Sequence, residues 1–281
     1  IERGSFDLVR EYAYPLPIIV IAEILGVPIS LLETFKRWSD DFVAPLGGNL
    51  SKERMIECSK SILEFNRYFT EELAERRRNP RDDVLTVMIQ AQIDGERPLE
   101  DNEALSILAQ LLVAGNETTT NAFGHTLWLI LSTEGLLDRL IADDSLVDNI
   151  VEEALRVESP VQGLFRQVRV DTEIAGVAIP KGSSLLTLFA SANRDDAQFP
   201  EAAQFDPQRE NARRHLAFGQ GIHRCLGEPL AKKELQLGTR LLIRRLSGLR
   251  LAPGHEPRHQ PHPLLRGFGA LHLEFEPGAK T

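Results

Sequence analysis

The sequence is poor in cysteine: Cys58 and Cys225 are the only two in 281 residues. Two cysteines build no disulfide framework, so we expect the protein in a reducing cytoplasm. No apolar run approaches the roughly 20 residues that a membrane-spanning helix needs. The longest, ALSILAQLLVAG at 104–115, is too short, and no signal peptide is evident. The net charge of −9 argues against a nucleic-acid partner.

The composition, 42% hydrophobic and 26% charged, is that of a soluble globular protein. A chain of this length is enough for one large domain or two ordinary ones. Because we find no internal repeat and no low-complexity linker, we predict a single domain over residues 1–281. The chain opens on Ile1 in the middle of an amphipathic pattern, which is compatible with a piece of something longer.

Helical periodicity dominates the first 160 residues, and turn-punctuated β-type runs follow. We expect a helix interrupted near Pro15 and Pro17, and a second helix with Ser30 as its N-cap. The expected helices cover 7–27, 30–46, 51–78, 83–93, 100–131, 145–158 and 226–246. Short strands are expected in 165–193, irregular chain in 194–215 and a small sheet in the tail, 253–278. The predicted fold class is therefore mainly α with a small β region.

A glycine-spaced loop precedes the second cysteine. Gly219 and Gly221 permit turns that are closed to other residues, and they let the backbone approach a flat partner closely. The helical pattern begins directly after Cys225, so a thiolate there would face free backbone N–H groups and the positive end of a helix dipole. Such a site stabilises a cysteine anion, which is what an iron ligand requires.

Other roles for this cysteine are open. A lone cysteine is more often a small buried thiol packed as a hydrophobe, and we assign that role to Cys58 on its amphipathic helix. Zinc is a weaker alternative, because His223 and Cys225 could bind it but no second Cys or His pair lies at finger or knuckle spacing. Haem fits a single thiolate better, since the porphyrin supplies four ligands itself.

The stretch FGQGIHRCLG, residues 218–227, resembles the haem-binding loop of the cytochrome P450 haem-thiolate monooxygenases. Two further motifs occur in the right order, so the resemblance covers essentially the whole chain. It is greatest to the soluble bacterial class and corresponds to roughly the last two-thirds of a member. It implies a cytochrome P450 fold that is incomplete at the N-terminus, with heme b (iron protoporphyrin IX) as cofactor and Cys225 as the metal ligand. The implied cofactor-binding residues are Ala114, Gly115, Arg166, Phe218, Gly219, His223, Cys225 and Gly227.

A polar motif, AGNETTT at 114–120, interrupts the long apolar helix. Gly115 there costs about 1 kcal/mol relative to alanine. Threonine hydroxyls can bond back to the preceding turn, and a kink would open room for water. A polar face turned to solvent is an equal alternative for the threonines alone. The resemblance implies instead that Glu117 and Thr118 are catalytic and deliver protons to dioxygen, which favours a reductase-driven reaction over a peroxide-dependent one.

The stretch EEALR places Glu153 and Arg156 three residues apart on one helix face. Taken alone, such a pair is usually exposed and contributes less than about 1 kcal/mol. In the family the corresponding pair is buried and is completed by an arginine before the cysteine loop, here Arg209 in FDPQR. The resemblance thus implies a structural ion cluster, in which loss of one partner costs about 3–5 kcal/mol.

The resemblance also implies propionate, substrate and redox-partner contacts. Arg166 and His223 match family residues that pair with the haem propionates. Without the resemblance, an exposed charge on a strand is an equal alternative for Arg166. A basic patch around the cysteine loop could dock an acidic ferredoxin or flavodoxin, or it is only a solvated run. The patch consists of Arg213, Arg214, Arg224, Lys232 and Lys233. A small-to-medium apolar substrate would contact Val113, Ala114, Thr118, Val161, Gly163, Leu164, Leu265 and Phe268.

Together the motifs predict a haem-dependent monooxygenase that inserts one oxygen atom of O2 into an apolar organic substrate, with electrons from a redox partner. The alternative is a non-catalytic haem-binding or apo helical fragment. The family's first third, which packs on one side of the haem and caps the substrate, cannot be located in this chain. The chain is then the visible part of a longer protein, a cleaved or truncated form, or a complete variant without oxygenase activity. The intact motifs favour the first two.

Overall fold

The computed structural model describes residues 2–48, 50–93, 95 and 97–278. The chain forms two compact units, one made of Arg10–Thr120 and one made of Ile1–Val9 together with Asn121–Thr281. We call the first the helical unit and the second the mixed unit. The predicted single domain over 1–281 stays a prediction. The expected mainly α architecture with a small β region is confirmed.

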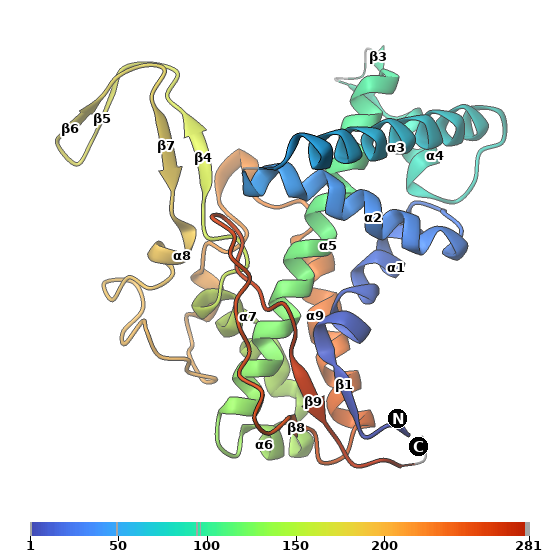
Figure 1. The fold of residues 1–281 in the computed structure, drawn as a ribbon. Coiled ribbons are helices and arrows are strands. Elements are labelled where there is room, and N and C mark those ends of the chain that lie inside the picture. Colours follow the sequence, from blue (N-terminus) through green and yellow to red (C-terminus); the bar gives the residue numbers. More distant parts are fainter. Residues whose placement is uncertain (1, 49, 94, 96, 279–281) are drawn as a thin grey trace. The chain divides into compact units, whose positions relative to one another are not determined.

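The helical unit is a layer of helices with one short hairpin (Figure 1). Its core is aromatic: Phe35 and Trp38 of α2 pack against Phe65 and Phe69 of α3, with ring centroids 4.6–6.5 Å apart. The elements are η1 (Val9–Ala13), α1 (Pro15–Ile24), η2 (Ile29–Leu31), α2 (Leu32–Val43), η3 (Ala44–Gly47), α3 (Lys52–Arg78), α4 (Val84–Gln90), β2 (Gln92–Ile93), β3 (Arg97–Pro98) and the first part of α5 (Asp101–Ser132).

The helix ends follow from local hydrogen bonding. Ser51 caps α3 by accepting from the N–H of Arg54, and Asp83 caps α4 by accepting from the N–H of Thr86. The prediction that Ser30 caps α2 is wrong, because Ser30 lies inside η2 and no side chain caps α2. Helix α4 also ends before the expected residue 93, since Gln92–Ile93 pairs with Arg97–Pro98.

The mixed unit combines helices with three small antiparallel sheets. The tail expected to form a small sheet supplies one strand of the sheet β1-β9-β8, namely β9. Strand β8 lies just before residue 253, and β1, where Phe6 pairs with Leu273, was not expected. Besides the rest of α5, the elements are β1 (Ser5–Asp7), α6 (Leu136–Ala142), η4 (Asp144–Leu146), α7 (Val147–Val157), β4 (Leu164–Gln167), β5 (Thr172–Ile174), β6 (Val177–Ile179), β7 (Ser184–Thr187), α8 (Phe189–Ala192), η5 (Ala212–Arg214), η6 (Gly221–His223), α9 (Glu228–Arg245), β8 (Arg250–Leu251) and β9 (His272–Glu274).

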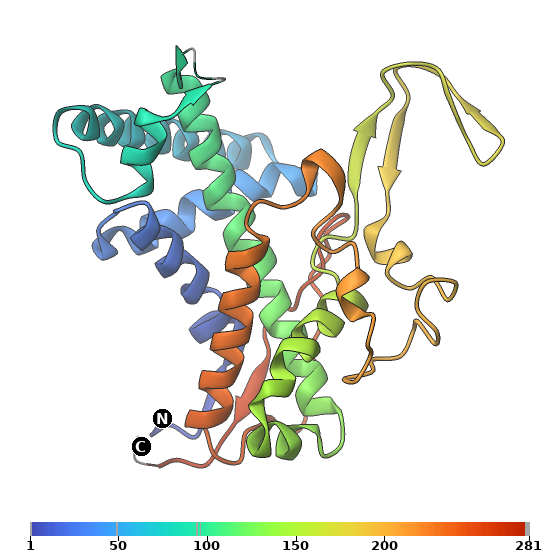
Figure 2. The ribbon, with the colours of Figure 1, turned by 180° about the vertical axis from the view of Figure 1, so that it is seen from behind.

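Strands β4 and β7 form a two-stranded ribbon that continues into the β5–β6 hairpin (Figures 1 and 2). All four residues of β4 are exposed, and the apolar side chains of Phe165, Leu186 and Leu188 face solvent. Since a two-stranded sheet buries little on its own, this ribbon presents apolar surface on the mixed unit.

Helix α5 is the longest, with 32 residues. Even so, no helix among the described residues combines the length and the apolar character that crossing a membrane requires.

Candidate functional site

The cysteine loop is a series of tight turns closed by backbone hydrogen bonds. The N–H of Gly219 donates to the carbonyl of Leu216, and the N–H of Cys225 donates to the carbonyl of Phe218, both at 2.9 Å. Gly219 and Gly221 have φ angles of 67° and 76°, in the left-handed region that favours glycine. The glycines therefore provide the turns expected of them.

Cys225 presents its thiol at the surface, just before α9. It is exposed and lies three residues ahead of Glu228, where α9 begins. Gly227 precedes the helix without a side-chain cap, and Pro229 in the first turn has no N–H, so the positive dipole end of α9 is left for an anion. The neighbouring Ile222 and Leu226 are 96% and 87% exposed. A haem is a flat apolar group whose iron can bind a thiolate. It would cover the exposed apolar side chains beside the thiol, so these residues fit a haem.

Two cationic or titratable side chains of the mixed unit are available for carboxylates. Arg166, on β4 opposite Leu185, donates only to the carbonyl of Phe165, at 3.0 Å, among the described residues. His223 ends η6 and is exposed. Neither has an acidic partner in the described part of the chain, so both can serve haem propionates.

The zinc alternative at Cys225 finds no support. Within the described ranges, the one group of three His, Cys, Asp or Glu ligands that lie together includes neither His223 nor Cys225. A protein zinc site takes three or four such ligands.

A buried carboxylate, Glu152, ties three elements together beneath the loop. It pairs with Nε2 of His215 at 3.0 Å and with Nζ of Lys232 at 2.9 Å. Burial alone raises the pKa of Glu152, but the hydrogen bonds from His215 and Lys232 outweigh it and lower that pKa. Helix α7 is thereby joined to the start of the loop and to α9. Sequence reasoning missed Glu152 and His215, since nothing in EEALR distinguishes its first glutamate.

This network corrects the predicted basic patch. Lys232 is only 20% exposed and is paired with Glu152 and Glu228, while Arg224 pairs with Glu228 at 2.7 Å. Because their charges are neutralised within the mixed unit, Lys232 and Arg224 contribute little to the patch. Arg213, Arg214 and Lys233 are exposed.

The structure brings Glu153, Arg156 and Arg209 together in a buried cluster. The Glu153 carboxylate accepts two hydrogen bonds of 2.7 Å from Arg156 and one of 3.0 Å from Arg209. The side chains of Glu153 and Arg156 are fully buried, and that of Arg209 is 7% exposed. Arg156 and Arg209 also donate to backbone carbonyls of the segment 193–204, so the cluster holds the irregular chain that leads into the cysteine loop.

The polar motif of α5 lies in the helical unit. The Thr118 hydroxyl donates to the carbonyl of Ala114 at 2.6 Å, which is the expected back-bond. Helix α5 nevertheless continues through 114–120 without a break, so the expected kink does not interrupt it. Asn116 is fully buried and donates to the hydroxyl of Ser39 at 3.2 Å. Ala114 is exposed, whereas Val113, Gly115 and Glu117 are half-buried.

The predicted substrate contacts of the mixed unit fall into different environments. Val161 and Leu265 face each other in an isolated antiparallel bridge, and Leu164 is 42% exposed. A Cβ on Gly163 would lie 2.5 Å from the carbonyl oxygen of Thr187, so the chain approaches β7 closely there. Phe268 is only 3% exposed, and this burial does not support its role as a substrate contact.

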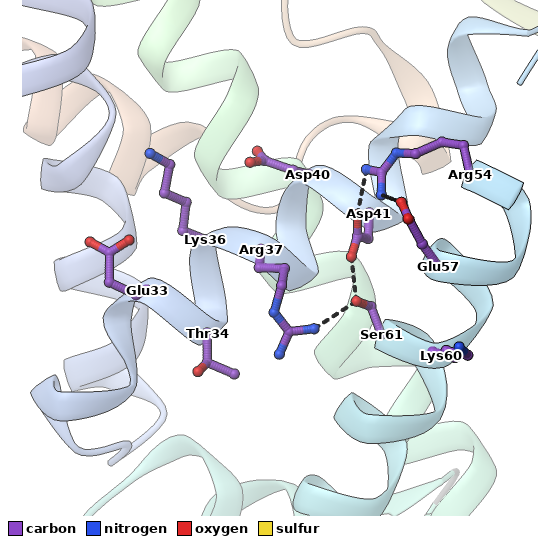
Figure 3. Close-up of a pocket in the computed structure, with 10 residues that line it drawn as sticks. All are labelled: Glu33, Thr34, Lys36, Arg37, Asp40, Asp41, Arg54, Glu57, Lys60 and Ser61. Atoms are coloured by element: carbon purple, nitrogen blue, oxygen red, sulfur yellow. Dashed lines mark hydrogen bonds and ion pairs between the residues drawn. The ribbon is translucent and has the colours of Figure 1, made fainter.

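A charged hollow lies between α2 and α3 of the helical unit, with a volume of about 790 Å³ (Figure 3). The Asp41 carboxylate accepts hydrogen bonds from Arg54 and from the Ser61 hydroxyl there. It contains none of the predicted site residues, and its charged lining does not suit an apolar substrate. The lining residues are Glu33, Thr34, Lys36, Arg37, Asp40, Asp41, Arg54, Glu57, Lys60 and Ser61.

A sequence model of the family Cytochrome P450 matches residues 31–272. The chain belongs to the cytochrome P450 family. It is 41% identical over 249 residues to the cytochrome P450 YjiB of Bacillus subtilis, covering 86% of this chain and 61% of that protein. It is 40% identical over 250 residues to the steroid C26-monooxygenase of Mycobacterium tuberculosis, covering 89% of this chain and 67% of that protein. The chain thus spans about three-fifths to two-thirds of the length of these P450 relatives.

Solved P450 structures confirm the predicted fold. CYP109Q5 from Chondromyces apiculatus superposes with a TM-score of 0.88 at 41% identity, covering 98% of this chain and 67% of that one. CYP109E1 from Bacillus megaterium in complex with testosterone gives 0.90 at 35% identity, covering 97% and 73%. Cytochromes P450 use heme b, which agrees with the fit of the Cys225 loop to such a group.

Proposed function

We propose that the protein acts as a haem-dependent monooxygenase that inserts one oxygen atom of O2 into an apolar organic substrate, with electrons from a ferredoxin- or flavodoxin-type donor. The observation that carries this proposal is the exposed Cys225 thiol, presented by two left-handed glycines at the start of α9. The relative named as a steroid C26-monooxygenase supports it. Both cysteines are free, which suits a cytoplasmic location.

In this proposal the loop residues hold the cofactor. The Cys225 thiolate would bind the iron, stabilised by the dipole of α9. The exposed side chains of Ile222 and Leu226 would cover the apolar cofactor and exclude water, and Arg166 and His223 would bind the propionates. When bound, the haem supplies the redox-active iron centre at which O2 is activated. Glu152 and the Glu153 cluster act one step away, by fixing both ends of the loop.

Thr118 and Glu117 serve as the proton relay. The Thr118 hydroxyl donates to the Ala114 carbonyl, and its oxygen keeps two lone pairs. Rotation of the hydroxyl away from that carbonyl would free its proton for transfer while its oxygen accepts another. The adjacent Glu117 is half-buried and is the acid that can resupply that proton. The substrate would contact Val113, Val161, Gly163, Leu164 and Leu265, and the donor would dock on Arg213, Arg214 and Lys233.

The spectrum of the reduced, carbon monoxide-treated protein tests the cofactor assignment. We expect a Soret band strongly red-shifted from that of histidine-ligated haem proteins. Cys225→Ala should abolish it, whereas Cys58→Ala, which removes the buried free thiol of α3, should leave it unchanged. A wild-type chain with no band, or with a histidine-type band, would instead support the non-catalytic haem-binding or apo fragment.

The ratio of product formed to reducing equivalents consumed tests the relay. Thr118→Ala should keep haem bound but divert reducing equivalents to peroxide, because the proton-carrying hydroxyl is lost. Thr118→Ser, which retains the hydroxyl, should stay coupled. Equal coupling in Thr118→Ala and the wild type would show that the relay is assigned wrongly while leaving the haem assignment intact.

A further inference from the structure

Two histidines and a glutamate, distant in sequence, converge in the mixed unit outside the residues assigned to haem. His125 lies on α5, Glu158 directly follows α7, and His259 belongs to the tail. The two Nε2 atoms are 3.2 Å apart, and each lies 4.0 Å from Oε2 of Glu158. We call these three residues the His–His–Glu cluster. Among the residues that the structure describes, it is the one group whose donor atoms could share a metal ion.

Close packing of the tail on α5 fixes the two imidazoles. His259 and Phe268 form an antiparallel bridge, and the Phe268 ring packs on His125 and His259 with centroid distances of 4.8 and 4.6 Å. A Cβ on Gly267 would lie 1.8 Å from Oδ1 of Asn121, so only glycine lets the tail come this near to α5. The donor atoms are thus held in place by backbone and ring contacts rather than by flexible side chains.

The spacing of the nitrogen atoms matches a zinc site. Two ligands at about 2.1 Å from a tetrahedral zinc ion are about 3.4 Å apart. The imidazole pair already meets this spacing, and Glu158 would have to approach by roughly 0.6 Å. The two Nε2 atoms face each other in one hydrogen bond, in which only one of them can donate, so the other already presents its lone pair toward the cluster.

Two arginines limit the affinity. Nε of Arg266 lies 2.5 Å from Oε2 of Glu158, and a terminal nitrogen of Arg194 lies 3.0 Å from Oε1. Each carboxylate oxygen keeps a second lone pair for a metal, but the guanidinium charges oppose a dication. A set of two imidazoles and one partly neutralised carboxylate favours zinc-like ions over Mg²⁺ or Ca²⁺.

We propose that the His–His–Glu cluster binds one divalent first-row transition-metal ion, with Zn²⁺ as the fitting ion. Three protein ligands leave a fourth position for water, which can enter beside His259, whose side chain is 29% exposed. The bound ion joins α5, the end of α7 and the tail, so it acts as a structural clasp of the mixed unit. This proposal does not rest on the haem assignment.

Metal titration of the full 281-residue chain tests the proposal. The Cys225→Ser background removes the exposed thiol as a competing ligand. Isothermal titration with Zn²⁺ should show one ion per chain, and Co²⁺ should give visible bands without thiolate charge transfer. His125→Ala and His259→Ala should each weaken binding at least tenfold. His272→Ala, which removes an exposed tail histidine, should bind as the background does.

Arg266→Gln gives the sharpest readout, because it removes a positive charge beside the ligand. It should bind Zn²⁺ more tightly than the background, whereas a merely structural His–His contact predicts no such gain. Zn²⁺ should also raise the melting temperature of the background but not that of His259→Ala. Because the His259 side chain is partly exposed, we expect this variant to fold. Binding that is absent, or that is equally strong in His125→Ala and His259→Ala, would overturn the proposal.

Discussion

Replacing Arg156 tests whether the ion cluster is a buried structural element. Its guanidinium has five N–H donors, and every one has an acceptor. Two donate to the carboxylate of Glu153 at 2.7 Å. The other three donate to backbone carbonyls, those of Asn193 and Ala202 at 2.7 Å and that of Gln204 at 2.9 Å. Lysine offers three donors at one point, so Arg156→Lys loses at least two of these five hydrogen bonds.

The expected loss of stability follows from this count. A hydrogen bond contributes about 0.5–1.5 kcal/mol net, so the loss of at least two in Arg156→Lys should lower the unfolding free energy of the mixed unit by about 1–3 kcal/mol. Arg156→Ala also leaves the Glu153 charge with Arg209 as its only guanidinium partner, and should cost about 3–5 kcal/mol. Water cannot compensate, because the side chains of Glu153 and Arg156 are fully buried.

Hydrogen exchange followed by mass spectrometry measures these losses, since it reports the two units separately. Peptides covering 193–209 should lose protection in Arg156→Lys. The matched control is Arg78 of α3, which pairs with Glu75 in the same Glu-x-x-Arg spacing at 2.9 Å but is 72% exposed. Arg78→Lys should leave protection unchanged. Equal protection of these peptides in the two lysine variants would show that the buried cluster does not stabilise the mixed unit more than an exposed pair does.

Two further substitutions probe the mixed unit. Burial raises the pKa of Glu234 to about 7 from its ordinary value of 4.5, so the folded protein holds this proton more tightly than the unfolded chain does. Stability should therefore fall as pH rises from about 4.5 to about 7, and Glu234→Gln should remove that part of the pH dependence. Melting temperatures of both proteins at pH 5 and pH 8 check this. An equal change in melting temperature in the two proteins would contradict it. Gly163→Ala should destabilise by about 1–3 kcal/mol, because its Cβ would lie 2.5 Å from the carbonyl oxygen of Thr187; an unchanged denaturation midpoint would show that β7 yields at no cost.

Local sequence patterns predict the structure where a single element decides the outcome. The long helices α3, α5 and α9 follow from apolar periodicity, and the left-handed turns at Gly219 and Gly221 follow from glycine's lack of a Cβ. Predictions failed where neighbours intervened. Ser30 was expected to cap α2, but the chain forms a 3₁₀ turn there. Strand β1 has three residues, and its pairing with β9, more than 260 residues away, leaves no local periodicity.

The sequence by itself determined the helical architecture, the thiol placed at a helix start and, through its motifs, the family. Those features depend on residues adjacent in the chain, whose spacing alone sets the geometry. Tertiary structure decided which charges are buried: Glu75–Arg78 and Glu153–Arg156 have the same spacing, yet one pair faces solvent and the other lies in the core. It also brought His125, Glu158 and His259 together and neutralised Lys232. Burial and long-range contact arise only when distant segments pack, so no local pattern records them.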